Sequence, residues 1–293
     1  MNNIASPTLP IVRHRWIEAD GMNIFYREAG PADAPALLLL HGFPSGSHQF
    51  RGLIARLADR YRVIAPDMPG FGFTQIPEAR GYAYSFDALA RTMDALTDAI
   101  GFGRFALYVF DFGAPVGLRM AVERPERIAA LISQNGNAYE EGLTDGWAPI
   151  RAYWVDPSPA NRAGLADALL TAEATRWQYL HGVPDPELVA PESWTLDAAL
   201  LDRPGVREAM LDLILDYRSN VALYPRFQQW LREHRPSVLA IWGRNDPFFD
   251  FAGAEAFRRD VPDAVIEALD TGHFALETHG HVIAASIRSF LGG

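Results

Sequence analysis

Short apolar and β-branched runs alternate with longer stretches of helical periodicity along most of the chain. Each short run is bounded by Gly, Pro or Asp, which is typical of strands that end in tight loops. This alternation predicts an α/β fold built on a mostly parallel sheet. Eight strands are expected, over residues 15–19, 23–28, 36–40, 62–65, 105–110, 128–133, 237–242 and 264–269.

The segments between the predicted strands carry turn and helix signals. Asp20-Gly21 separates the first two strands and predicts a hairpin. Phe86, Leu89 and Met93 recur at helical spacing, which indicates one buried helical face. Helices are expected over residues 48–58, 86–100, 114–123, 253–259 and 280–290.

The alternation of strands and helices stops between residues 137 and 231, where prolines break the pattern into several helices. This predicts a helical lid over 137–231, inserted into a core domain made of residues 1–136 and 232–293. Aromatic residues at helical spacing often serve simple packing, but an aromatic-rich insertion over the edge of a sheet also indicates a hydrophobic pocket. The insertion contains the tryptophans Trp147, Trp154, Trp177 and Trp194.

Composition excludes several kinds of chemistry and partner. The net charge of -10 argues against nucleic acid, because a phosphate backbone needs a basic protein surface. The absence of cysteine and lysine excludes thiol catalysis, zinc–thiolate sites and Schiff bases. No run is apolar enough for a membrane span, and residues 1–10 lack the pattern of a leader. We expect a cytoplasmic monomer or homodimer that uses no metal and no organic cofactor.

A candidate nucleophile ends the apolar run 105–110. Asp111 follows this run directly, Gly113 lies two residues further on, and a helical pattern begins there. In a sharp strand-to-helix turn, one side chain projects above the sheet and a small residue two places on lets strand and helix approach closely. Val109 departs from this pattern, since a small residue is usual there. The alternative role for Asp111 is a helix N-cap.

Two further residues complete a catalytic order. Asp246 follows the predicted strand 237–242, and His273 follows the predicted strand 264–269. Nucleophile, acid and histidine in this chain order are typical of one large hydrolase fold. Each has a simpler alternative, Asp246 as a turn residue before proline and His273 as a structural loop histidine. Three such coincidences in order favour a triad of Asp111, Asp246 and His273.

These motifs resemble those of a known superfamily. His41-Gly42-Phe43-Pro44 follows a strand and is similar to the oxyanion loop of α/β-hydrolases, and the segment 65–72 is similar to the loop after their next strand. The resemblance covers nearly the whole chain. An aspartate at the elbow is typical of the epoxide hydrolase and haloalkane dehalogenase branch. The resemblance implies the α/β-hydrolase fold, with an eight-stranded, mostly parallel sheet and an inserted helical lid.

The resemblance also implies a two-step reaction. The Asp111 carboxylate would attack a saturated carbon and form an ester. His273, oriented by Asp246, would then activate a water molecule that hydrolyses this ester. The backbone N–H groups of Phe43 and Phe112 would stabilise the oxyanion that develops on Asp111. The expected partners are a small hydrophobic substrate and water.

The leaving group decides which activity is predicted. Epoxide hydrolases use lid tyrosines as proton donors, and Tyr217 in Asp216-Tyr217-Arg218 resembles one of them. Tyr153 is the preferred candidate for the second donor, ahead of Tyr139 and Tyr179, and Trp154 could serve a halide. An epoxide hydrolase that forms a vicinal diol is therefore favoured.

Two other functions are compatible with the sequence. A haloalkane or haloacid dehalogenase is the first alternative, but such enzymes hold the halide or carboxylate with donors beside the nucleophile, where this chain has Phe112 and Phe43. A binding protein that keeps the fold without turnover is the second alternative. The intact triad argues against it, and the aspartate at the elbow excludes an ordinary serine esterase.

Overall fold

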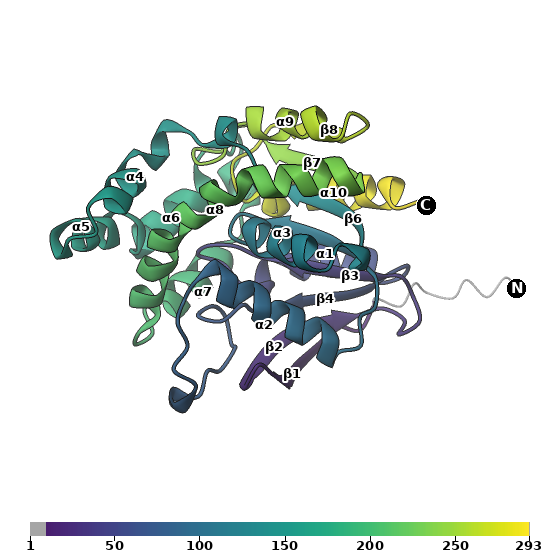
Figure 1. Cartoon of the computed structure of the whole chain (residues 1–293), viewed down its shortest axis with the longest axis horizontal. Coiled ribbons are helices and arrows are strands. Elements are labelled where there is room, and N and C mark those ends of the chain that lie inside the picture. Colours follow the sequence, from purple (N-terminus) through teal and green to yellow (C-terminus); the bar gives the residue numbers. More distant parts are fainter. Residues whose placement is uncertain (1–9, 293) are drawn as a thin grey trace, which may run out of the picture.

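The computed structural model of the protein describes residues 10–292, which contain one eight-stranded sheet (Figure 1). The first nine residues, on which the expectation about a leader rests, lie outside the described residues. The strands match the predicted runs within two residues at each end. They are β1 (Arg13–Ala19), β2 (Met22–Ala29), β3 (Ala36–Leu40), β4 (Arg62–Pro66), β5 (Phe105–Phe110), β6 (Ile128–Gln134), β7 (Ser237–Gly243) and β8 (Val265–Leu269).

The sheet is mostly parallel, in the order β1-β2-β4-β3-β5-β6-β7-β8. β1 pairs with β2 as the predicted hairpin, and β2 pairs antiparallel with β4. From β4 onward all neighbours are parallel, so their carboxyl ends meet at one edge. The register aligns Phe110 with Gln134 and Gln134 with Ile241. Residues that follow β5, β6 and β7 are thereby brought together.

The two faces of the sheet carry separate apolar layers, because successive strand residues point to opposite faces. Leu38 and Leu40 pack into the layer formed with α2 (Phe86–Ala99) and α3 (Gly113–Glu123). Leu37 and Leu39 pack into the other layer, formed with α1 (Arg51–Leu57) and α10 (Ala275–Phe290). Strands buried on both faces read as continuous apolar runs, which is why they were recognisable in the sequence.

The helix predictions differ from the structure mainly at helix ends. The predicted helix over 48–58 divides into a 3₁₀ turn, Ser47–Phe50, and α1. The predicted helix over 280–290 is the second part of α10, which begins at Ala275 and is kinked at His279. α9 (Ala252–Asp260) matches its prediction within one residue at each end.

Five α-helices lie between β6 and β7, and most of them gather at one end of the sheet in Figure 1. They are α4 (Ala148–Val155), α5 (Pro159–Leu169), α6 (Ala172–Leu180), α7 (Pro191–Leu201) and α8 (Val206–His234). α8 packs on α4, α5 and α7 and also on α2, α3 and α9, so it runs from the inserted helices back across the sheet. The predicted lid boundary at residue 231 falls inside this continuous helix, and the division into two domains stays a prediction.

Within residues 10–292, no helix has the length and hydropathy needed to cross a membrane.

Candidate active site

Asp111 lies at a strained turn between β5 and α3. Its φ is 47°, a left-handed conformation that costs roughly 1–3 kcal/mol for a residue with a side chain. Close approach enforces the turn, since a Cβ on Gly113 would lie 2.4 Å from the Leu40 carbonyl oxygen. A Cβ on Gly42 would lie 2.2 Å from Asp111 Oδ1. The structure therefore has the geometry of the predicted elbow, with the carboxylate presented to the loop after β3.

The structure also explains how the elbow accommodates Val109. A Cβ on Gly117, one turn into α3, would lie 2.6 Å from Val109 Cγ1. A Cβ on Gly136, after β6, would lie 3.3 Å from Val109 Cγ2. In a usual elbow, a small residue on the strand leaves room for close packing. Here the strand carries Val109, and the room is provided by Gly117 on the helix and Gly136 on the neighbouring loop.

The Asp111 carboxylate is buried and partly satisfied by backbone donors. The Phe43 N–H donates to Oδ1 at 2.6 Å, so one of the two predicted oxyanion donors already contacts the carboxylate. Burial raises the pKa of Asp111 to about 6, against the lowering effects of His273 and of the Phe43 and Phe112 N–H groups. At neutral pH this carboxylate is mostly ionised but poorly solvated, which favours attack on an electrophile.

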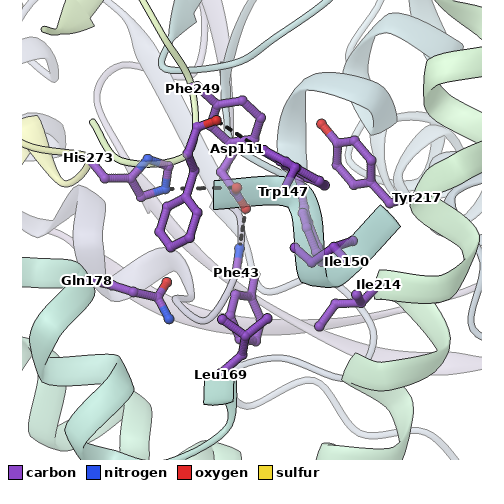
Figure 2. A pocket seen from close by; sticks show the side chains of 12 residues that line it. Phe43, Asp111, Trp147, Ile150, Leu169, Gln178, Ile214, Tyr217, Phe249 and His273 are labelled. Atoms are coloured by element: carbon purple, nitrogen blue, oxygen red, sulfur yellow. Dashed lines mark hydrogen bonds and ion pairs between the residues drawn. The ribbon is translucent and has the colours of Figure 1, made fainter. Parts of the chain in front are cut away.

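His273 joins Asp246 and Asp111. Its Nδ1 lies 2.6 Å from Asp246 Oδ2. Its Nε2 lies 3.8 Å from Asp111 Oδ2, the contact marked by a dashed line in Figure 2. Asp246 Oδ2 accepts this hydrogen bond when the neutral imidazole carries its proton on Nδ1, and Nε2 then has its lone pair toward Asp111. Burial lowers the pKa of His273, but Asp246 and Asp111 outweigh it and raise that pKa above 6.5. The three residues of the predicted triad thus meet in space.

Asn135 is a site residue that the sequence analysis did not identify. It follows β6 with a φ of 47°, and its Nδ2 donates to Asp246 Oδ2 at 2.7 Å. Its Oδ1 accepts from the Gly243 N–H at 2.9 Å, so the amide is held between two strands. The N–H of Phe248 donates to the other Asp246 oxygen at 2.8 Å. The sequence does contain a signal for a site residue here, because the apolar strand ends in three polar residues, 133–135.

A narrow pocket opens above Asp111 and His273 (Figure 2). The space open to the centre of a water molecule is only about 30 Å³, enough for one or two waters. Besides the triad members Asp111 and His273, it is lined by Phe43, Phe112, Trp147, Ile150, Leu169, Gln178, Ile214, Tyr217, Phe248 and Phe249. This lining suits a small hydrophobic ligand.

Tyr217 projects from α8 into this pocket, as Figure 2 shows. Its hydroxyl is buried and has no hydrogen-bond partner of good geometry among the described residues. Burial, the neighbouring Tyr224 hydroxyl and the Asp111 carboxylate raise the pKa of Tyr217 well above 10. The phenol therefore stays protonated and is available to donate.

Tyr153 and Trp154 do not line the pocket, although both were predicted to contact substrate. The Tyr153 hydroxyl is engaged by Arg162 Nη1 at 2.9 Å. Trp154 lies behind Tyr217, with the two rings parallel at 6.2 Å, and its indole N–H donates to the Ile214 carbonyl at 2.7 Å. These contacts follow from the direction of α4, which presents Ile150 to the cavity instead, as does Trp147 at the N-cap of this helix.

Trp147 and Gln178 are pocket residues that the sequence analysis did not assign. The Trp147 indole N–H is used by the Phe248 carbonyl at 2.9 Å. The Gln178 side chain is 2 % exposed, and its Nε2 has no hydrogen-bond partner among the described residues. Trp147 is one of the four tryptophans of the insertion that predicted a pocket, but the sequence did not show which of them line it. Gln178 lies in no recognisable motif, so only the packing of the inserted helices reveals its position.

The site offers no metal-binding cluster. Among residues 10–292, no group of three or more His, Cys, Asp or Glu side chains is placed to hold a metal ion. The arrangement that is present, a buried carboxylate with a histidine, an acid and backbone donors, suits nucleophilic attack followed by base-assisted hydrolysis.

Comparison with known proteins agrees with this architecture. The family model of the alpha/beta hydrolase fold matches residues 35–280. The chain therefore belongs to the α/β-hydrolase-fold family, and the predicted resemblance is confirmed.

Individual relatives and a solved structure are also similar to the chain. An uncharacterized hydrolase of Saccharomyces cerevisiae is 47% identical over 279 residues, which cover 94% of this chain and 96% of the relative. Haloalkane dehalogenase 2 of Mycobacterium tuberculosis is 34% identical over 129 residues, 44% of each chain. The solved structure of an epoxide hydrolase from Vigna radiata superposes with a TM-score of 0.74 at 24% identity, covering 96% of this chain and 97% of its own. The family is thus one whose members include both predicted activities.

Proposed function

We propose that the protein is a hydrolase that opens a small hydrophobic epoxide through a covalent ester on Asp111 and releases a vicinal diol. The observation that carries this proposal is Tyr217, which lines the same pocket as Asp111 and whose buried hydroxyl lies beside Tyr224 without a hydrogen bond of good geometry among the described residues. An epoxide oxygen must gain a proton as its carbon–oxygen bond breaks, and a protonated phenol supplies it. A halide needs no proton.

In the first step, an Asp111 oxygen attacks one epoxide carbon while the bond from that carbon to the ring oxygen breaks. Tyr217 gives its proton to that oxygen and regains one from water later. The buried position of Asp111 favours this step, because forming the neutral ester removes the charge of a poorly solvated carboxylate. That negative charge passes to the leaving oxygen and, with the proton transfer, to the Tyr217 phenolate.

In the second step, His273 Nε2 accepts a proton from a water molecule that attacks the ester carbonyl of Asp111. The oxyanion forms on an Asp111 oxygen, where the Phe43 N–H already lies at 2.6 Å. One such donor contributes on the order of 3 kcal/mol. Collapse of the intermediate breaks the ester bond, and the proton on His273 passes to the departing alcohol oxygen to complete the diol. The second proton of the water molecule is left on the Asp111 carboxyl and is released through solvent, which restores the Tyr217 hydroxyl. Asp246, held by Asn135, keeps the imidazole oriented.

A haloalkane dehalogenase is the second candidate, because a relative over part of the chain carries that name. Halide ions are held by weak donors such as indole N–H groups. The indoles of Trp147 and Trp154 instead donate to backbone carbonyls. Because both indole N–H groups already donate to backbone carbonyls, an epoxide is favoured over a halide as the substrate group.

Intact-protein mass spectrometry on His273→Gln tests the proposal directly. This variant should form the ester but hydrolyse it slowly, since it lacks the base. After exposure to mixed epoxides and haloalkanes we expect a mass gain equal to one whole epoxide. A gain equal to a haloalkane minus hydrogen halide would identify a dehalogenase instead.

The matched control is Asp111→Ala/His273→Gln, which should gain no mass from either reagent because the nucleophile is gone. Asp111→Ala alone should lose turnover. Full activity in Asp111→Ala, or an adduct in the double variant, would overturn the ester mechanism.

A further inference from the structure

Gln178 is a buried polar side chain that the proposed reaction does not use. It comes from α6, is 2 % exposed and lines the same pocket as Asp111. Its Nε2 has no hydrogen-bond partner in the described part of the chain. Leaving a buried donor without a partner is unfavourable unless a ligand or a water molecule satisfies it. This amide is therefore placed to meet a ligand atom.

Gln178 also lies where the pocket approaches the surface. Gln178 and Leu169 line both the inner pocket and a second depression on the outside of α5 and α6. Trp177, which is 47% exposed, borders that outer depression. Gln178 and Leu169 thus lie between the reaction site and the surface depression. We call these two residues the throat.

Figure 2 shows the throat and Tyr217 on different sides of Asp111. In the proposed reaction the leaving oxygen faces Tyr217, so the rest of the substrate extends toward the throat. The inner cavity is too narrow for a long substituent, with about 30 Å³ open to the centre of a water molecule. A substituent on the epoxide must therefore pass beside the Gln178 amide.

We propose that Gln178 selects epoxides whose substituent carries an uncharged hydrogen-bond acceptor, such as an ether or carbonyl oxygen, close to the ring. This inference rests on the proposed function and names its substrate class. The free Nε2 is a donor, which requires an acceptor on the ligand. No arginine lines the pocket within the described residues, so a carboxylate there would be buried without a partner charge.

Methyl glycidyl ether and 1,2-epoxypentane test this selection, because they differ only by an oxygen in place of a methylene group. We expect the protein to favour the ether by about tenfold in kcat/KM, the ratio that corresponds to one neutral hydrogen bond. In Gln178→Met, a side chain of similar length without the amide, the ratio should fall to about one. Gln178→Leu serves the same purpose if the methionine variant does not fold.

Leu169→Met is the matched control at the throat. It changes shape without changing hydrogen bonding, so both substrates should respond alike and the tenfold ratio should persist. An equal response of both epoxides to Gln178→Met, or a wild-type ratio near one, would overturn the selective role of Gln178.

Binding of the two corresponding diols, measured by calorimetry, separates this inference from the proposed function. If neither epoxide turns over but the ether diol binds about tenfold more tightly and Gln178→Met abolishes the difference, only the epoxide reaction fails. If both epoxides turn over and neither diol nor epoxide shows the preference, only the role of Gln178 fails. Absence of both turnover and preferential binding contradicts both.

Discussion

Asp111 and His273 share a buried site in which each changes the proton affinity of the other. The Asp111 carboxylate raises the pKa of His273, and His273 lowers that of Asp111 from the higher value that burial alone would impose. The 3.8 Å distance between Nε2 and Oδ2 keeps the histidine lone pair free for water. In the proposed reaction, forming the ester on Asp111 removes one of these charges, so the two steps meet different electrostatic conditions.

The pH dependence of turnover follows from these shifts. The proposed attack requires ionised Asp111, whose pKa is about 6, so kcat/KM should fall up to tenfold per unit below pH 6. Hydrolysis requires neutral His273, and its pKa should be lower in the ester, where the Asp111 charge is absent, than in the free protein. Tyr217 stays protonated, so no alkaline decline is expected up to about pH 10.

Steady-state profiles of the epoxide reaction from pH 5 to 10 would check the free protein. Single-turnover ester hydrolysis would check the second step. A decline of kcat/KM that begins below pH 9 on the alkaline side would contradict the assigned state of Tyr217.

At the scale of elements, β5 and α3 pack with the larger side chain on the strand and the glycine on the helix. Val109 fills space that a smaller strand residue would leave, and Gly117 on the facing helix makes room for it. Because protein interiors are close-packed, the residue types at these two positions depend on each other.

Gly117→Ala should therefore lower the free energy of unfolding, even though alanine favours a helix by about 1 kcal/mol. The added Cβ would lie 2.6 Å from Val109 Cγ1, and such overpacking costs about 1–3 kcal/mol. Val109→Ala/Gly117→Ala should be destabilised by less than the sum of the single variants, with a coupling of about 1 kcal/mol. Urea unfolding of the three variants measures this coupling.

Gly280→Ala is the control, since a Cβ on this helical glycine meets nothing within 4 Å. It should leave stability unchanged or raise it slightly. Additive losses at residues 109 and 117 would refute the packing account of the elbow.

At the scale of the whole molecule, polar contacts fasten the inserted helices to the core. Ser193 on α7 contacts Arg51 of α1 at 2.9 Å and Glu277 of α10 at 3.0 Å. Tyr179 on α6 donates to Asp197 on α7 at 2.5 Å, and its ring stacks on Phe274 at 3.7 Å. Phe274 follows His273, so these contacts connect the inserted helices to the triad.

Asp197 makes stability depend on pH. Burial raises its pKa to about 8, far above 3.8. Between these values the folded protein holds a proton that the unfolded chain releases, so stability falls as pH rises toward 8 and levels off above it. Asp197→Asn cannot ionise, and its stability relative to wild type should increase from pH 5 to pH 8 by up to about 1.4 kcal/mol per unit.

Urea unfolding at five pH values between 5 and 9 measures this difference. Thr195→Ala, an exposed and uncharged change on the same helix, should differ from wild type by a constant amount across the range. A constant difference for Asp197→Asn as well would show that Asp197 is ionised throughout.

The sequence alone determined the sheet and the positions, at strand ends, of the three residues predicted to form a triad. Strands buried on both faces appear as apolar runs, and parallel βα order brings their carboxyl ends to one edge. Asp111, Asp246 and His273 could therefore be recognised from their positions after three such runs. Local pattern was sufficient because each of these residues lies where a strand ends.

Only the tertiary structure decided which side chains of the inserted helices face the pocket. Tyr217 was predicted correctly to lie there, but Tyr153 faces Arg162, while Trp147 and Gln178 line the cavity. Asn135 likewise acquires its contact with Asp246 from a neighbouring strand. Helical periodicity gives the spacing of a face but not its direction in space, because direction depends on contacts with distant helices.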